Sequence, residues 1–399
     1  MTSRERSILI VSCYGHFMSH FNMLIFPAIL LPLVGRLQLP MTEVLALSFW
    51  MYLFFGITAL PWGILADRFG PRPLLAVFHI GAGISAFWAA MNMDNSGTLG
   101  LALAGIGLFS GIYHPAGLGW IAKEVEKTSR AMSYNGMFGN LGLAMAPLLA
   151  GIVNYFWGAE AVYVVVGLLN LLGLLFLYSA KGSNGVVQVK KAEAGERVST
   201  LRPFLVLLVC MMLGGVVYRG ITVSLPAYFE LRNGALYEGL TGMLGSLGSA
   251  NVVATSLISI IYLVGMGGQF LGGRMGERFD LRRGYFVFHL ITIPLALLMA
   301  VSLDWWLVGF ALVHSFFLLG MQPIENTLVA RLSPPKLHSS AYGLKFVLTF
   351  GVGALSIKLV GWVEQGWSLN AVYVALAMVS VVLVTAIAVL SRVTPSMKS

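Results

Sequence analysis

The chain has 399 residues, of which 58% are hydrophobic and 10% are charged, and its formal net charge is +9. Soluble domains carry about 25% charged residues, and a core of this size could not keep so much apolar surface from water. The composition therefore excludes a soluble enzyme, a disulfide-stabilised secreted domain and a disordered chain. It indicates an all-α polytopic membrane protein, in which the basic excess reflects the charge of the loops rather than nucleic-acid binding.

Twelve stretches are apolar and long enough to cross a bilayer as helices, each of which needs about 20 residues. In chain order they are expected at 8–35, 44–66, 73–92, 98–121, 131–153, 161–180, 203–229, 251–272, 284–302, 305–330, 340–362 and 369–391. Helices are expected throughout, because an open sheet edge would leave backbone groups unpaired in lipid. The Gly-rich stretch 230–250 holds either a short surface helix or a gate.

Basic residues are unevenly divided between the predicted loops. If the N-terminus is cytoplasmic, 21 of the 25 Lys and Arg residues lie in cytoplasmic segments, whereas Arg36 and Arg232 lie outside. Positively charged loops remain on the cytoplasmic side, so we expect both termini in the cytoplasm and the chain integral to a plasma membrane, the bacterial inner membrane. The first apolar stretch is too long for a signal peptide, and we expect it to be retained.

The sequence contains an internal repeat after spans two and eight. Five positions recur 210 residues later, so that Gly63, Asp67, Arg68, Phe69 and Arg72 become Gly273, Glu277, Arg278, Phe279 and Arg282. The polar stretch 181–202 is the expected cytoplasmic linker between an N-terminal half, 1–180, and a C-terminal half, 203–399. Each half has six spans in the same orientation, and parallel repeats of this kind place a substrate site between the halves.

The segment GILADRFGPR, from Gly63 to Arg72, resembles the signature loop between spans two and three of the major facilitator superfamily. The resemblance covers essentially the whole chain, and it implies two parallel six-helix repeats that transport a small molecule by alternating access. It also implies a cytoplasmic gate whose acid pairs with arginine in one state only, formed by Gly63, Asp67, Arg68, Arg72, Gly273, Glu277, Arg278 and Arg282. The alternative is that these charges only set the topology.

Span five has a second pattern of interest. It carries Gly139, Gly142, Pro147 and Gly151, which loosely resembles the glycine and proline pattern on span five of proton-coupled exporters. Small residues let neighbouring helices approach closely, and proline introduces a kink. The alternative is that these residues serve tight helix packing alone.

A narrower resemblance rests on three short segments. The sequences SHFN at 19–22, YHP at 113–115 and YRGITVSLP at 218–226 are similar to the group that includes the fosmidomycin-resistance exporters. That group usually has an acid at the position where Met23 stands in this chain. The substrate of the group is therefore not carried over.

Ionisable side chains inside the predicted spans are the candidate sites, because a charge in hydrocarbon is costly and usually serves function. Arg219 on span seven matches carboxylate, phosphate or phosphonate groups, so we expect it to contact an anionic substrate or else to form a structural ion pair. On span ten, Glu325 is expected to carry a proton or else to pair with Lys345. Gln322, next to Pro323, is a further candidate for substrate binding or proton coupling.

Histidines on two spans are further candidates for proton coupling, because histidine titrates near neutral pH. His16 and His20 share one face of span one, and His114 lies on span four; the alternative for each histidine is a neutral core residue. Asn22 on span one is a further candidate for substrate binding or proton coupling. Cys13, His16 and His20 are weak candidates for metal ligands. Three ligands along one helix do not converge well, so no metal site is expected.

No nucleotide-binding loop, catalytic triad or redox motif occurs in the sequence, so we expect neither an enzyme nor a cofactor. The prediction is a monomeric secondary transporter that exports a small, anionic compound or drug, driven by a proton or another coupling ion. The alternatives are uptake symport of an organic anion, transport of a transition metal, and a receptor that does not transport. The expected partners are the substrate, the coupling ion and the lipid bilayer, without nucleic acid.

Overall fold

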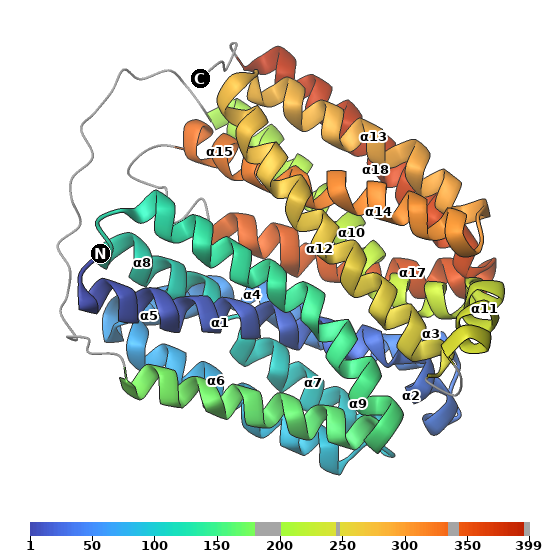
Figure 1. Cartoon of the computed structure of the whole chain (residues 1–399). Coiled ribbons are helices and arrows are strands. Elements are labelled where there is room, and N and C mark those ends of the chain that lie inside the picture. The colour runs from blue at the N-terminus through green and yellow to red at the C-terminus, as the bar shows by residue number, and fades with distance from the viewer. Residues whose placement is uncertain (180–200, 245–247, 334–342, 395–399) are drawn as a thin grey trace. The chain divides into compact units, whose positions relative to one another are not determined.

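The computed structural model describes residues 1–179, 201–244, 248–333 and 343–394. These residues are almost entirely helical and contain no strand. The chain divides into two compact units, Met1–Lys190 and Lys191–Ser399 (Figure 1). The predicted linker 181–202 lies almost wholly outside the described residues, so the predicted boundary between the halves stays a prediction.

The N-terminal unit is built from a series of helices that starts at Ser3. They are α1 (Ser3–Ala28), α2 (Leu30–Leu37), α3 (Met41–Ala46), α4 (Phe49–Ile57), α5 (Ala59–Phe69), α6 (Pro71–Met91), α7 (Ser96–Ser110), the π-helical turn η1 (His114–Leu118), α8 (Gly119–Glu124) and α9 (Thr128–Ser179). The N-terminus lies at the same end of this unit as α8 (Figure 1), where Arg4 forms an ion pair with Glu124.

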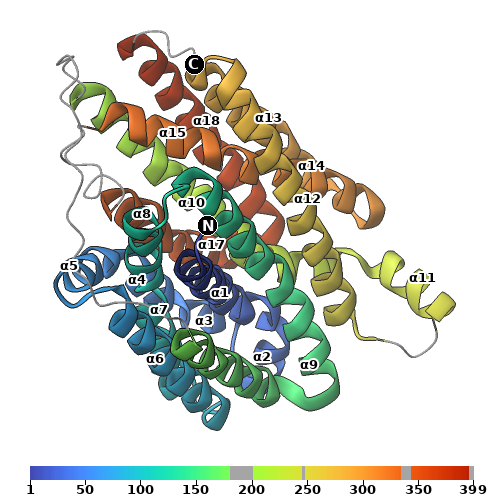
Figure 2. The ribbon, with the colours of Figure 1, turned by 60° about the vertical axis from the view of Figure 1, so that its left-hand side comes forward.

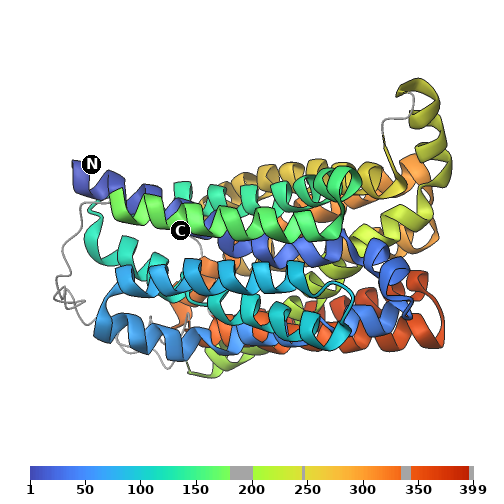
Figure 3. The same cartoon turned by 90° about the horizontal axis from the view of Figure 1, so that it is seen from below.

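The C-terminal unit contains a second series of helices. They are α10 (Leu201–Arg232), α11 (Gly234–Leu244), α12 (Ala250–Arg278), α13 (Leu281–Val301), α14 (Asp304–Gly320), α15 (Gln322–Leu332), η3 (Val347–Gly351), η4 (Val352–Ala354), α17 (Leu355–Gly366) and α18 (Leu369–Val393). The stretch 230–250 includes α11, which lies at one end of the unit (Figures 2 and 3). The sequence left open either a short surface helix or a gate in this stretch, and the structure has a short helix, α11.

The number of membrane spans follows from helix length. Ten described helices are apolar and long enough to cross a membrane, and the bent pair Leu30–Leu37 and Met41–Ile57 makes an eleventh. At about 1.5 Å per residue, the 52 residues of α9 exceed twice the roughly 30 Å of a bilayer core. This helix is broken at Gly158, whose φ of 83° is in the left-handed region that glycine tolerates. With α9 counted as two spans there are twelve, which confirms the predicted fold class.

Polar N-caps begin helices in both units. Side-chain oxygens accept backbone N–H groups at Thr2, Asn95, Ser249, Asp280 and Ser368, which begin α1, α7, α12, α13 and α18. These caps satisfy donors that have no partner within the helix. The sequence thus begins the apolar helices at polar positions near the ends of the predicted spans.

Glycines of α9 allow a close approach to α1. The helices α1 and α6 both lie along α9 (Figure 2). A Cβ added at Gly142 would overlap the backbone carbonyl of Phe17, and one at Gly139 would lie 2.6 Å from the ring of His16. Pro147 and Gly151 follow on the same helix, and both are buried.

One end of each unit carries the same kind of arginine contact. Arg72 donates to the carbonyl of Leu177 near the end of α9 (3.1 Å), and Arg282 donates to the carbonyl of Ser391 near the end of α18 (2.9 Å). Basic groups stabilise the unpaired carbonyls at a helix C-terminus. The internal repeat is therefore visible in the contacts as well as in the sequence.

The opposite end of the N-terminal unit is held by one arginine. Arg36 forms ion pairs with Asp94, after α6 (2.6 Å), and with Glu160, beyond the break in α9 (2.5 Å). Its hydrogen bonds hold the pKa of the Asp94 carboxyl below its usual range. Exposed pairs of this kind contribute little to stability, so their effect is to align the helix ends.

We expect the substitution Gly142→Ala to destabilise the protein, because the new methyl group would overlap the backbone of α1. The loss should be about 1–3 kcal/mol, the usual cost of overpacking, and should lower the melting temperature of the protein in detergent. Gly136→Ala on the same helix is the matched control, because no atom lies within 4 Å of its added Cβ. Equal melting temperatures for the two variants would contradict this account of the α1–α9 contact.

Candidate functional site

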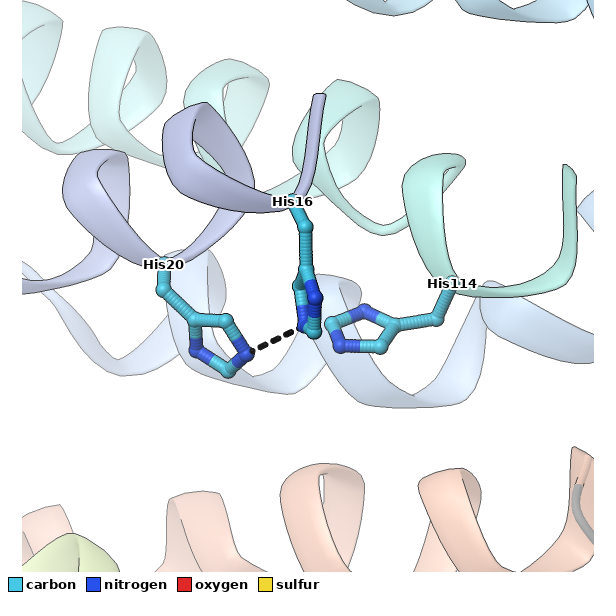
Figure 4. Close-up of side chains that lie close together, drawn as sticks. All are labelled: His16, His20 and His114. Carbon is cyan, nitrogen blue, oxygen red and sulfur yellow. Dashed lines mark hydrogen bonds between the residues drawn. The ribbon is translucent and has the colours of Figure 1, made fainter. Parts of the chain in front are cut away.

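Three histidine rings meet inside the N-terminal unit. His16 and His20 project from α1 toward His114 of η1 (Figure 4). The Nε2 atoms of His16 and His20 are 3.1 Å apart, and one nitrogen from each of the three rings lies within 4.8 Å of the others. His114 is buried, whereas His16 and His20 are half-buried. We call these three residues the histidine cluster.

The π-helical turn η1 positions His114. Pro115 follows it and lacks a backbone N–H, which removes one helical hydrogen bond. A π-helical turn contains an extra residue and therefore changes the direction in which its side chains point. The edge of the His114 ring faces both other rings, with centroid distances of 5.3 Å to His16 and to His20.

A second layer of contacts orients His16. Its Nδ1 is 2.8 Å from the backbone carbonyl of Asn135, which can only accept a hydrogen bond. The proton is therefore assigned to Nδ1, and the lone pair of Nε2 faces the cluster. The amide of Asn135 donates to the hydroxyl of Tyr113 (2.7 Å), and the Tyr113 ring stacks on His16 at 5.0 Å.

Asn22 belongs to a separate buried network. Its amide donates to the hydroxyl of Ser110 (3.0 Å) and to Asn170 (3.3 Å), and the amide of Asn170 donates back (3.1 Å). The network joins α1, α7 and α9 and satisfies polar groups away from water. Asn22 therefore helps to hold α1 against α7 and α9.

The C-terminal unit contains a buried ion pair between Glu325 of α15 and Lys345. The ammonium group of Lys345 is 2.8 Å from one carboxylate oxygen of Glu325, and the hydroxyl of Tyr285 donates to the other oxygen at 2.8 Å. Lys345 also donates to the side chain of Asn326 (2.5 Å). Only 3% of Glu325 and 7% of Lys345 is exposed. The structure therefore contains the ion pair with Lys345 that the sequence analysis gave as the alternative role of Glu325.

Two more predicted residues lie in the C-terminal unit. The amide of Gln269 on α12 donates to the side-chain oxygen of Gln322 at 2.7 Å. Arg219 on α10 is 3% exposed, and its guanidinium carbon lies 5.9 Å from the ring centre of Tyr218. A guanidinium offers N–H donors in a planar fork that matches a carboxylate or phosphate group.

The predicted gate residues make contacts at the helix ends. Asp67 forms an ion pair with Lys123 of α8 at 2.6 Å, and Arg68 lies over the ring of Phe69 at 5.3 Å. Proline packs against glycine in both loops, where Cβ atoms added to Gly63 and Gly273 would lie 3.3 and 3.9 Å from Pro115 and Pro323. These contacts stabilise the loop in the state described.

The second copy of the gate differs from the first. Arg282 forms a two-pronged ion pair with Asp280, with distances of 2.6 and 2.9 Å. Arg278 is exposed at the end of α12, and the side chain of Glu277 lies outside the described residues. The ion pair of Arg282 is therefore with the N-cap of its own helix.

The structure adds residues that sequence reasoning missed. Tyr285 and Asn326 complete the surroundings of Glu325, Asn135 orients His16, and Lys123 pairs with Asp67. All but Lys123 are polar side chains inside the predicted spans, a signal that the sequence does contain. Cys13 is buried but does not belong to the histidine cluster, whose third ring comes from η1.

Two apolar helical repeats with polar groups buried inside each one define a polytopic membrane transporter. The family model of the Major Facilitator Superfamily matches residues 12–258, more than half of the chain. The chain belongs to the major facilitator superfamily, a family of transporters and not of enzymes. It is 23% identical over 393 residues to an uncharacterized MFS-type transporter, YfnC, of Bacillus subtilis (strain 168), covering 94% of this chain and 90% of the relative.

Solved structures are similar over nearly the full length. A bacterial homologue of the human lysosomal transporter Spinster, inward-facing and occupied, gives a TM-score of 0.78 at 13% identity and covers 99% of this chain and 98% of that one. A peptide transporter, POT, in complex with sulfate gives 0.72 at 16% identity, covering 96% and 95%. Such low identity shows the fold alone. The narrower likeness to fosmidomycin-resistance exporters stays a prediction.

We expect Lys345→Met to be strongly destabilising, because it leaves the carboxylate of Glu325 buried without its cation. Removing one partner of a buried pair costs about 3–5 kcal/mol, which thermal unfolding in detergent would detect. The exposed Lys358→Met on α17 is the matched control and should change the melting temperature little. The double variant Glu325→Gln with Lys345→Met should recover most of the loss, and a double variant as unstable as Lys345→Met would contradict the pairing.

Proposed function

We propose that the protein is a secondary transporter that exports a small anionic compound in exchange for protons, by alternating access of two six-helix halves. The proposal places it in the bacterial inner membrane, as a monomer with both termini in the cytoplasm. Membership of a transporter family supports the general mechanism. The observation that carries the proton coupling is the buried pair of Glu325 and Lys345.

Glu325 is the proposed proton carrier. In its ionised form it holds Lys345 at 2.8 Å and accepts a hydrogen bond from Tyr285. Protonation removes the negative charge, so the attraction to Lys345 falls and an unbalanced positive charge is left in the unit. A change that stabilises one conformation more than the other shifts the equilibrium between them, which is what coupling requires.

Arg219 is the proposed contact for the anionic substrate. Its guanidinium offers parallel N–H donors that match a carboxylate, phosphate or phosphonate group. Gln322, near Glu325 on α15, is proposed as a neutral substrate contact that exchanges its present bond with Gln269.

The remaining predicted residues have supporting roles in this proposal. His16, His20 and His114 line the polar interior of the N-terminal unit, and Asn22 fixes α1. The gate residues of the two loops form contacts that differ between conformations, and the pair of Asp67 with Lys123 is one such contact. The close α1–α9 approach at Gly139 and Gly142 is proposed to let these helices move as one body.

We expect small organic anions, tested as a panel of phosphonates and carboxylates, to raise the melting temperature of the purified protein. A ligand that binds only the folded state adds about 2.7 kcal/mol of stability at one hundred times its Kd. The shift should disappear in Arg219→Gln and persist in Arg232→Gln, a matched arginine on the same helix. Stabilisation by cations alone, or an anion shift that persists in Arg219→Gln, would overturn the assignment.

We expect Glu325→Gln to uncouple transport of the anion found in that panel. In proteoliposomes, exchange of labelled for unlabelled anion should continue at a reduced rate, whereas accumulation driven by a pH gradient should fall at least about 10-fold. The exposed Glu238→Gln on α11 is the control and should retain gradient-driven accumulation. Intact accumulation in Glu325→Gln would exclude this residue as the proton carrier, and assays in vesicles of both orientations would separate export from uptake.

A further inference from the structure

The histidine cluster has the geometry of a metal site. Zinc binds imidazole nitrogen at about 2.0–2.1 Å, so tetrahedral ligands lie roughly 3.4 Å from one another. The Nε2 atoms of His16 and His20 are already 3.1 Å apart, and all three ligand atoms lie within 4.8 Å. Convergence comes from using two segments, α1 and η1, since three ligands on α1 alone would diverge.

The groups around His16 orient its ring for metal coordination. A metal-bound histidine characteristically donates its other N–H to a carbonyl or carboxylate, which fixes its tautomer and orientation. His16 makes this contact through Nδ1 to the carbonyl of Asn135, at 2.8 Å. Stacking on Tyr113 holds the ring, and the missing side chain of Gly139 leaves the space that the ring occupies.

The ligand set selects a class of metal. Three neutral imidazoles suit zinc, copper, nickel or cobalt, whereas magnesium and calcium prefer oxygen ligands. Three protein ligands leave a fourth position open to water or an anion, as in exchangeable zinc sites. Between Glu5 and Glu43 the sequence has no acidic residue, so α1 offers no carboxylate to hold the cluster as imidazolium, the form that cannot bind metal.

We propose that His16, His20 and His114 bind a divalent transition-metal ion of the zinc type within the N-terminal unit. The site is distinct from the one that sequence reasoning weighed, because His114 replaces Cys13 as the third ligand. This proposal does not rest on proton coupling or on the anionic substrate, since its ligands belong to the N-terminal unit and Glu325 and Arg219 to the other.

The test measures metal binding by the full chain, purified in detergent with a tag that contains no histidine. Titration with Co²⁺ should give visible absorption bands of a nitrogen-ligated ion at about one equivalent, and Zn²⁺ should displace them. Substitutions His114→Gln and His20→Asn should each weaken binding at least about 10-fold. Glutamine is a suitable replacement for His114, because the C-terminal unit already has a glutamine before a proline in a similar place: Gln322 precedes Pro323 as His114 precedes Pro115.

Controls separate loss of the site from loss of the fold. His79→Gln removes a buried histidine of the same unit outside the cluster and should leave the cobalt spectrum unchanged. Melting temperatures without metal report folding of each variant. Absence of saturable binding in the unaltered chain, or unchanged binding in both ligand variants, would overturn the proposal. Glu325→Gln should bind metal normally, so the failure of either proposal is visible independently of the other.

Discussion

The cost of placing polar and charged groups inside apolar helices constrains everything else in this protein. Each unit contains a few such groups, and the structure satisfies them with specific partners: Lys345 and Tyr285 for Glu325, Asn170 for Asn22, and Asn135 for His16. A contact of this kind is conditional when a change in protonation or a bound ligand replaces one partner by another. A transporter needs such conditional contacts, since its conformations must differ in energy according to what is bound.

The two units share an internal repeat but bury different polar groups. Asn135 and Lys345 stand 210 positions apart, the spacing of the internal repeat, so the residue whose backbone carbonyl orients His16 corresponds to the cation that pairs with Glu325. The N-terminal interior is therefore built on imidazole and amide side chains, and the C-terminal interior contains an ion pair. A repeated fold lets each half specialise, because helix packing depends on small and apolar residues that are separate from the polar positions.

Helix breaks position the polar groups in both units. The π-helical turn η1 turns His114 toward α1, and the corresponding Pro323 lies near the start of α15, just before Glu325. Backbone irregularity inside a membrane is tolerated only where other groups satisfy the freed carbonyls. Such breaks are therefore expected where side chains must be directed inward, and here they lie at His114 and just before Glu325.

The sequence by itself determined the class of protein, the spans and the repeat, because hydropathy over some 20 residues and the charge of loops are local properties of the chain. It also identified His16, His20, His114, Arg219 and Glu325, since ionisable residues are rare in apolar spans. Only the tertiary structure decided which of them meet. The third ring of the histidine cluster lies about a hundred residues from the first two, and no periodicity links α1 to η1. Partnerships such as Tyr285 with Glu325 depend on how helices pack and turn, which is a property of the assembled unit.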